Sequence, residues 1–211
     1  MTNITRRSVL KTAGMAVAAA PVLAAARPAA AESTSTSLDR ADAVRIINEA
    51  RKIVNPGGIS RLETVKIGGI EQFVSIRGRS PKNPALLFLH GGPGYVSIPM
   101  SWWFSHPWEE YFTVVQWDQR GSGKTYLIND PAVVGPTMTF ERMVHDTEEM
   151  TKWVLGELNK EKIFVVAHSW GTYLGLQMAK HHPELLHAYV GVAQITNSPE
   201  SERRGWKHTM D

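Results

Sequence analysis

The chain has 211 residues, no cysteine and a formal net charge of +3. This length suits one domain with a substantial core, and the absence of cysteine excludes a disulfide framework. Four of the 23 basic residues precede residue 32, where no acidic residue occurs, so the remainder has 19 basic and 20 acidic residues and a net charge of −1. The charge therefore gives no reason to expect binding to nucleic acid or to an anionic membrane.

Residues 1–31 have the pattern of an export signal. Arg6 and Arg7 stand before an apolar stretch of Ala, Val and Leu, and residues 29–31 supply small side chains for cleavage. We therefore expect a twin-arginine signal peptide, interaction with twin-arginine export machinery, and a periplasmic or extracellular location. The apolar stretch is short and contains Pro21, so stable membrane insertion is not expected. A disordered basic tail is the alternative interpretation.

Residues 32–61 are expected to form a linker and an N-terminal helix. Residues 32–37 are rich in Ser and Thr. Apolar residues at helical spacing predict a helix over residues 38–54, which Asn-Pro-Gly-Gly at residues 55–58 ends. Residues 62–67 and 72–77 alternate apolar and polar side chains around two glycines, which predicts an antiparallel hairpin.

Beyond the hairpin, the patterns of strands and helices alternate. Short apolar runs predict buried strands at residues 85–89, 112–117, 163–167 and 189–193. Helical spacing predicts a helix over residues 140–158 with Thr139 as its cap, a partly helical segment over 102–111, and a helix from the turn at residue 169 to about residue 182. Residues 62–211 are therefore expected to form an α/β domain, a mostly parallel sheet with helices on both faces.

The sequence Ala-His-Ser-Trp-Gly at residues 167–171 joins an expected strand to an expected helix. It matches the nucleophile-elbow pattern G-x-S-x-G, with alanine in place of the first glycine. A serine on so sharp a turn holds its hydroxyl above the sheet, so Ser169 is the candidate catalytic nucleophile. An ordinary strand–turn–helix with a capping serine is the alternative.

A glycine cluster, His-Gly-Gly-Pro-Gly at residues 90–94, follows the strand expected at 85–89. Glycines leave backbone N–H groups uncovered, and acyl transfer needs two such donors where negative charge develops on the carbonyl oxygen. Trp170, which follows the candidate nucleophile, supplies one donor of this oxyanion hole, and we expect Gly92 to supply the other. A tight turn formed for conformational reasons is the alternative interpretation of the cluster.

Residues 118–125, Asp-Gln-Arg-Gly-Ser-Gly-Lys-Thr, end like a phosphate-binding loop. That motif requires glycine where Asp118 stands, so nucleotide binding is not expected. We expect Asp118 and Arg120 to brace this loop beside the active site instead. The sequence shows no cofactor-binding pattern and no pattern of metal ligands.

Three stretches in this order, HGGPG at 90–94, WDQRGSGKT at 117–125 and HSWG at 168–171, resemble the α/β-hydrolase superfamily and, within it, the proline iminopeptidase-like branch. The resemblance covers about residues 62–193. It implies a serine hydrolase that cleaves an N-terminal residue, often proline, from a peptide or arylamide through an acyl-enzyme on Ser169. An esterase or amidase of the same fold is an alternative. Serine at the elbow disfavours the haloalkane dehalogenase and epoxide hydrolase branches, which the resemblance associates with aspartate.

The resemblance also implies an acid and then a histidine after the serine, and usually a lid domain. Glu200 or Glu202 followed by His208 satisfies this order, but no predicted strand places them at the sheet edge. We therefore expect only the N-terminal six or so strands of such a domain, without lid and C-terminal strands, and little activity from the chain alone. A truncated, non-catalytic remnant or a binding module is the competing interpretation.

The remaining histidines are not expected to act as the base. His168 shares the strained turn with Ser169 and is poorly placed to take its proton, and His90 is expected to brace the glycine loop. Those at 181, 182 and 187 lie at or beyond the far end of the elbow helix, roughly 20 Å from the serine at ~1.5 Å per residue.

The tryptophans at positions 102, 103 and 108 leave two interpretations open. They fit core packing, in which aromatic side chains bury much apolar surface, and they equally fit the wall of a substrate pocket beside the glycine loop.

Overall fold

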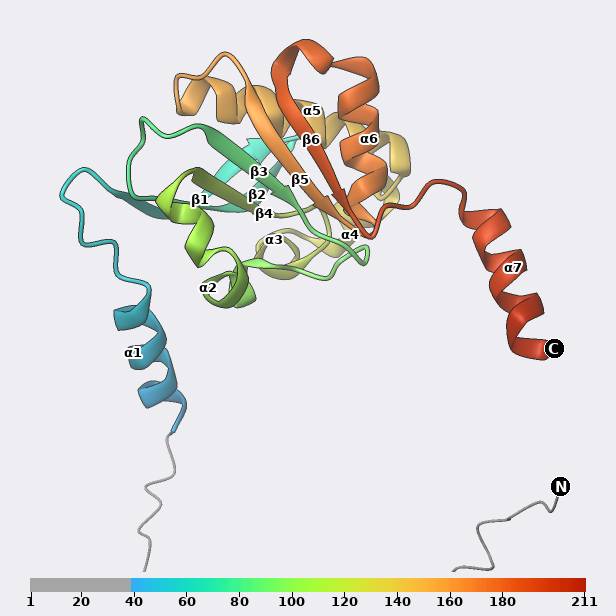
Figure 1. Cartoon of the computed structure of the whole chain (residues 1–211), viewed down its shortest axis with the longest axis horizontal. Coiled ribbons are helices and arrows are strands. Elements are labelled where there is room, and N and C mark those ends of the chain that lie inside the picture. Colours follow the sequence, from blue (N-terminus) through green and yellow to red (C-terminus); the bar gives the residue numbers. More distant parts are fainter. Residues whose placement is uncertain (1–38) are drawn as a thin grey trace, which may run out of the picture. The chain divides into compact units, whose positions relative to one another are not determined.

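A six-stranded sheet forms the centre of residues 39–211, the part of the chain that the computed structural model describes (Figure 1). Its strands are β1 (Ile59–Ile67), β2 (Ile70–Gly78), β3 (Ala85–Leu89), β4 (Thr113–Asp118), β5 (Ile163–His168) and β6 (Leu186–Val192). The α-helices are α1 (Arg40–Ala50), α2 (Ser101–Phe104), α3 (Gly123–Leu127), α4 (Pro131–Val134), α5 (Phe140–Glu157), α6 (Gly171–His181) and α7 (Ser198–Met210). Short 3₁₀ helices are η1 (Ile98–Met100), η2 (His106–Glu110), η3 (Gly135–Thr137) and η4 (Pro183–Leu185). The expected export signal and Ser/Thr-rich linker lie outside these residues and stay predictions.

The sheet joins an antiparallel hairpin to a set of parallel strands. Its order is β1-β2-β4-β3-β5-β6, in which β2 runs antiparallel to β1 and β4, and β4, β3, β5 and β6 run parallel. Leu89 lies opposite Ala167 and His168 lies opposite Val192, so β3, β5 and β6 end at one edge. This confirms the expected α/β fold and brings the loops that follow these strands together at that edge.

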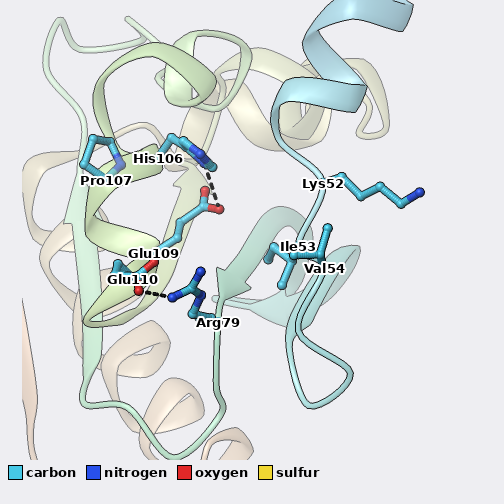
Figure 2. Close-up of a pocket in the computed structure, with 8 residues that line it drawn as sticks. All are labelled: Lys52, Ile53, Val54, Arg79, His106, Pro107, Glu109 and Glu110. Carbon is cyan, nitrogen blue, oxygen red and sulfur yellow. Dashed lines mark hydrogen bonds and ion pairs between the residues drawn. The ribbon is translucent and has the colours of Figure 1, made fainter.

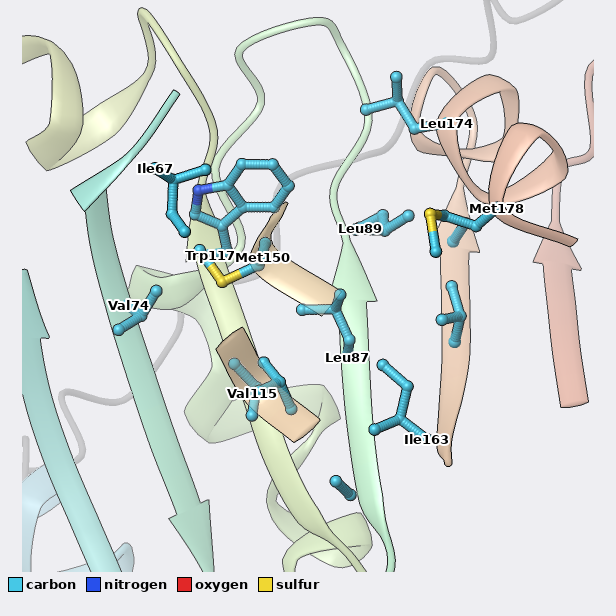
Figure 3. Close-up of a cluster of buried hydrophobic side chains, with 14 of the residues drawn as sticks. Ile67, Val74, Leu87, Leu89, Val115, Trp117, Met150, Ile163, Leu174 and Met178 are labelled. Atoms are coloured by element: carbon cyan, nitrogen blue, oxygen red, sulfur yellow. The ribbon is translucent and has the colours of Figure 1, made fainter. Parts of the chain in front are cut away.

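The larger hydrophobic core lies between one face of the sheet and helices α5 and α6. Leu87 and Val115 of the central strands are fully buried there, and they face Met150 of α5 and Met178 of α6 (Figure 3). Complete burial of one such side chain contributes roughly 1.5–3 kcal/mol. This packing fixes the position of α6, the helix that begins beside Ser169.

The opposite face of the sheet carries a smaller cluster. Phe88 is buried there against Phe104 of α2 and Trp108 of η2, with ring centroids 5.3 and 6.1 Å apart. Toward β6 this cover ends, because Val190 and Val192 are 49% and 46% exposed. Within residues 39–211, long helices therefore cover one face and short aromatic segments cover only part of the other.

The predicted elements are present with shifted ends. The first helix ends at Ala50 rather than residue 54, and β1 begins at Ile59 rather than 62 because its first residues pair with the end of β2. The strand expected at 189–193 begins earlier, at Leu186. Thr139 caps α5 as predicted, accepting a hydrogen bond from the Arg142 N–H at 3.1 Å.

Helix α7 was not predicted. The sequence does contain a signal for the start of this helix, an asparagine at 197 followed by a proline in the first turn. In the structure Asn197 caps the helix, accepting a hydrogen bond from the Glu200 N–H at 3.1 Å. None of its residues is buried, and Trp206 and Met210 are its only large apolar side chains, so the sequence carries too few apolar residues to mark a packed helix face. No helix within residues 39–211 is long and apolar enough to cross a membrane.

Candidate active site

Ser169 lies on the sharp turn between β5 and α6. Its φ of +50° is in the left-handed region that residues other than glycine seldom adopt. Its N–H donates to the Val192 carbonyl at 2.9 Å, and its carbonyl accepts from the N–H and hydroxyl of Thr172 at 2.9 and 2.6 Å. Within residues 39–211 its hydroxyl makes no hydrogen bond, so the backbone is held firmly while the side chain is available to react.

Small residues let α6 and β3 approach this turn closely. A Cβ on Gly171 would lie 2.3 Å from the carbonyl oxygen of Leu89, so only glycine fits there. A Cβ on Gly175 would lie 2.4 Å from the Tyr189 ring and 3.1 Å from Cβ of Ala167. Because Gly175 leaves this room, alanine can replace the first glycine of the elbow pattern without separating strand from helix.

The glycine loop at residues 90–94 lies against the serine. A Cβ on Gly91 would be 3.1 Å from Cβ of Ser169. Gly92 has a φ of +116°, and a Cβ there would be 2.6 Å from the Tyr95 nitrogen, so both position and conformation require glycine. The structure therefore brings together two motifs that lie far apart in the sequence.

The elbow and the glycine loop each offer one backbone N–H group to a ligand. Trp170 occupies the N-cap position of α6, and Gly92 lies in the glycine loop. Within residues 39–211, neither N–H donates a hydrogen bond in a turn, loop or helix cap. Unpaired N–H groups at a helix start carry partial positive charge, so this place can accept an anionic oxygen.

His90 braces the glycine loop, as expected. It is almost fully buried, its Nε2 accepts from the Gln119 N–H at 3.2 Å, and its Nδ1 lies 3.0 Å from the Gly91 carbonyl oxygen. These partners assign the proton to Nδ1. Burial lowers the pKa of His90, so the ring is neutral near pH 7 and ties the glycine loop to the loop after β4.

Internal contacts also hold the loop after β4. Asp118 Oδ2 accepts a hydrogen bond from the Lys124 N–H at 2.9 Å, and Lys124 Nζ lies 4.4 Å from the centre of the Phe73 ring. Arg120 Nε donates to Asp146 Oδ2 at 2.7 Å. Burial raises the pKa of Asp118, against the opposing effect of its Lys124 partner. The bracing role expected of Asp118 and Arg120 is confirmed. Asp146, the buried partner of Arg120 on α5, was missed by the sequence analysis.

No hydrogen bond within residues 39–211 joins an acid or a histidine side chain to the Ser169 hydroxyl. Glu200 is engaged by two arginines of its own helix, α7, while His208 is exposed on that helix. His182 pairs with Glu148 at 3.2 Å, and the ring of His187 stacks on Phe164. Residues 39–211 contain no cluster of three His, Cys, Asp or Glu side chains suited to a metal ion.

An apolar cavity of about 550 Å³ opens beside the elbow. Gly91 and His168, which contact or adjoin Ser169, line it together with aromatic and aliphatic side chains of the uncovered sheet face. Trp108 packs in the smaller core, which confirms the packing interpretation for this residue. Trp103 is 70% exposed and lines the cavity together with Trp108, and the substrate-pocket interpretation stays a prediction.

A second, smaller cavity of about 200 Å³ lies at the other edge of the sheet, where β2 ends and β4 begins (Figure 2). Its two acidic groups are paired internally. Glu109 is almost fully buried and accepts from Arg77 Nε at 2.9 Å, His106 Nδ1 lies 3.6 Å from its other oxygen, and Arg79 pairs with Glu110. We attribute to this cavity a structural role, away from the elbow.

Comparisons with known proteins agree with this geometry. A model of the α/β hydrolase fold matches residues 84–209. The probable aminopeptidase YbaC of Bacillus subtilis (strain 168) is 37% identical over 153 residues, which are 72% of this chain and 47% of that protein. The probable proline iminopeptidase of Leptolyngbya boryana is 32% identical over 110 residues, 50% of this chain and 30% of that protein.

Solved structures show the same fold. A proline iminopeptidase-related protein from Thermus thermophilus superposes with a TM-score of 0.51 at 24% identity, over 71% of this chain and 56% of that one. A 2-hydroxy-6-oxo-6-phenylhexa-2,4-dienoate hydrolase from Rhodococcus gives a TM-score of 0.50 at 24% identity, over 64% of this chain and 46% of that one. These likenesses concern the fold alone and do not choose between chemistries.

The chain matches about half or less of the length of these curated relatives. The residues that the family model matches include the glycine loop and the elbow. From the family model, the relatives and the fold together, the chain belongs to the α/β-hydrolase fold family and is proline iminopeptidase-like.

Proposed function

We propose that the protein is a serine hydrolase of the proline iminopeptidase type, which removes an N-terminal residue from peptides or arylamides. The observation that carries the proposal is Ser169, which has a φ of +50° and a hydroxyl free of hydrogen bonds within residues 39–211. It lies against the glycine loop at Gly91, and within the same residues the backbone N–H groups of Gly92 and Trp170 donate no hydrogen bond in a turn, loop or cap. The names of the relatives, aminopeptidase and proline iminopeptidase, support the class of substrate.

In the proposed mechanism, the Ser169 oxygen attacks the carbonyl carbon of the scissile amide and gives its proton to a general base. The N–H groups of Gly92 and Trp170 bind the oxyanion of the tetrahedral intermediate. Collapse breaks the C–N bond, the amine leaves with a proton, and an acyl-enzyme remains. Water then attacks the ester, releases the free carboxylic acid and restores the serine hydroxyl.

This mechanism requires a general base, and no residue within 39–211 is assigned to that role. An unactivated serine hydroxyl is a weak nucleophile near neutral pH, and an oxyanion hole alone leaves only a small residual rate. Because residues 39–211 bring no acid–histidine pair to Ser169 by hydrogen bonding, we expect them to hydrolyse little by themselves. The same observation favours the second candidate function, a binding module that keeps the fold and the cavity but has no turnover.

We further propose that the protein acts outside the cytoplasm, after export by the twin-arginine machinery. The arginine pair and the apolar stretch of residues 1–31 support this location. Export in a folded state suits a domain that contains no cysteine and needs no disulfide bond.

The experiment compares Ser169→Ala with Ser201→Ala in the protein purified from its source organism, with aminoacyl arylamides as substrates. We expect Ser169→Ala to abolish nearly all turnover, since loss of a triad serine costs about 10⁶-fold in a protease example. Ser201 is exposed on α7, so its replacement is the matched control and should leave the rate unchanged. Full activity of Ser169→Ala would overturn the proposal.

A further inference from the structure

A third cavity, of about 320 Å³, lies where α1 ends and β1 begins. Its lining also reaches the end of β2, where Arg77 lies opposite Ser60 of β1. Of the residues in 39–211 that line it, three carry cationic side chains, Arg51, Lys52 and Arg77, and none is acidic. The walls of this cavity therefore combine positive charge with hydrogen-bond donors.

The positive charges around this cavity are only partly neutralised. Within residues 39–211, the one carboxylate that pairs with any of the three cationic side chains is Glu109, which accepts from Arg77 Nε at 2.9 Å. Lys52 is exposed, and Figure 2 shows its side chain pointing away from Glu109. Three cations with one paired carboxylate leave two positive charges uncompensated.

Arg51 lacks an acceptor for one of its N–H groups. Its Nη2 donates to the Ser101 hydroxyl at 2.9 Å, but its Nε is buried and has no hydrogen-bond partner within residues 39–211. Burial lowers the pKa of the Arg51 guanidinium, and the nearby positive charge of Arg77 lowers it further, against the opposing effect of Glu109. An anionic oxygen beside Arg51 would supply the missing acceptor and reduce the repulsion between the two guanidinium groups.

The charge and the size of the cavity describe its ligand. A guanidinium group binds phosphate oxygens through paired hydrogen bonds, and a phosphate group carries about −1.5 to −2 charges at pH 7, which matches two uncompensated positive charges. The volume of about 320 Å³ is at the lower end of the roughly 300–1,000 Å³ of ligand pockets, so it suits a phosphate group with a small substituent. We propose that this cavity binds phosphate, as the free ion or as part of a small ester, through Arg51 and Lys52.

Bound phosphate would strengthen a junction of four elements. Arg77 of β2 donates to the Ser60 hydroxyl of β1 at 2.6 Å and to the carbonyl of Arg51, the residue that caps α1. Through Ser101, the same arginine reaches the start of α2. The site is therefore expected to stabilise the folded state, and it does not depend on hydrolysis at Ser169.

The first test measures binding to the full chain purified from its source organism. Isothermal titration calorimetry compares orthophosphate, phenyl phosphate and acetate at equal ionic strength and near-neutral pH. We expect at least one of the two phosphate compounds to bind about 10-fold or more tightly than acetate, and the tighter of the two identifies the free ion or an ester as the ligand. Equal binding of acetate, or no binding of either phosphate compound up to about 10 mM, would overturn the proposal.

The second test removes the two donors in turn. Arg51→Gln should weaken phosphate binding by about 10-fold, and Arg51→Lys, which keeps the charge without the planar fork, should restore only part of it. Arg45→Gln removes an exposed arginine of α1 that does not line the cavity, so it is the matched control and should bind like the parent. Unchanged affinity in Arg51→Gln would contradict the proposal.

Lys52→Gln keeps the test decisive where Arg51→Gln fails to fold. Lys52 is exposed, and within residues 39–211 its side chain makes no ion pair, so its replacement should leave the fold intact. Phosphate at about ten times its dissociation constant should raise Tm of the parent by roughly 3–6 °C relative to chloride. At the same concentration the rise should be smaller in Lys52→Gln and unchanged in Lys66→Gln, an exposed lysine of β1 outside the cavity. Equal rises in these two variants would show that phosphate acts elsewhere and would overturn the proposal.

Discussion

Replacing Gly171 by alanine should destabilise the protein, although alanine is the better helix former. Gly171 is the first residue of α6, and its added methyl group would lie 2.3 Å from the Leu89 carbonyl oxygen, whereas ordinary contacts begin at 3.4 Å. The obstacle is backbone of a central strand, which cannot rotate aside as a side chain can. Helix and strand must therefore separate by about an ångström, and overpacking of this kind typically costs about 1–3 kcal/mol.

The matched control adds the same methyl group where there is room. Gly156 lies near the end of α5 with no atom within 4 Å of a Cβ built there, so Gly156→Ala should stabilise the protein by about 0.4–1 kcal/mol through reduced freedom of the unfolded chain. Urea unfolding of both variants measures the two changes in the free energy of unfolding. In thermal unfolding, each 1 kcal/mol corresponds to a shift in Tm of about 2–4 °C for a domain of this size. Equal effects of the same sign would refute the close approach of α6 to β3.

Three further predictions concern the surroundings of the site and the export signal. Asp146→Ala should lower the free energy of unfolding by about 3–5 kcal/mol, because it leaves the buried Arg120 charge unpaired. Glu157→Ala, which breaks the more exposed pair with Arg61, should change it by about 1 kcal/mol or less in the same denaturation assay. Burial lowers the pKa of His90, so the folded state keeps the ring neutral. The stabilising contribution should therefore be complete above the unfolded pKa of about 6.5 and decline as the pH falls below it. A denaturation midpoint that is independent of pH between 5 and 8 would contradict this, as would a His90→Gln variant whose midpoint changes with pH as steeply as that of the parent. Replacing Arg6 and Arg7 by lysine should leave precursor in the cytoplasm, and fractionation that shows unchanged export would refute the assignment of the signal.

The fold could be predicted because local patterns and tertiary packing agree in most of the chain. The wholly apolar run at residues 85–89 is a central strand, and its five residues are all buried. The spacing of Met143 and Met150 places both in the larger core, as the helical pattern requires. The ends of elements were less predictable, because β1 is extended by pairing with β2 and not by its own composition.

The candidate site was predictable where the proposed chemistry requires particular residue types in an unusual backbone conformation. The turn at Ser169 and the glycine at 92 follow from motif and context, and the parallel strands β3 and β5 bring the turn against the glycine loop at Gly91. Asp146 was missed although it stands on the buried stripe of α5 between Met143 and Met150, where an acidic residue signals a buried partner. The sequence analysis predicted that tryptophans could line a cavity, but not that cavity's shape, because the shape depends on how the aromatic segment after the glycine loop folds over the sheet.

The most direct test of the account is the site at which a fluorophosphonate labels the protein purified from its source organism. The reagent reacts with activated serines, and mass spectrometry of the digest identifies the modified residue. The account predicts a single phosphonylated residue, Ser169, with labelling abolished in Ser169→Ala and retained in Ser201→Ala. Labelling at another serine, undiminished labelling of Ser169→Ala, or no labelling at all would contradict it.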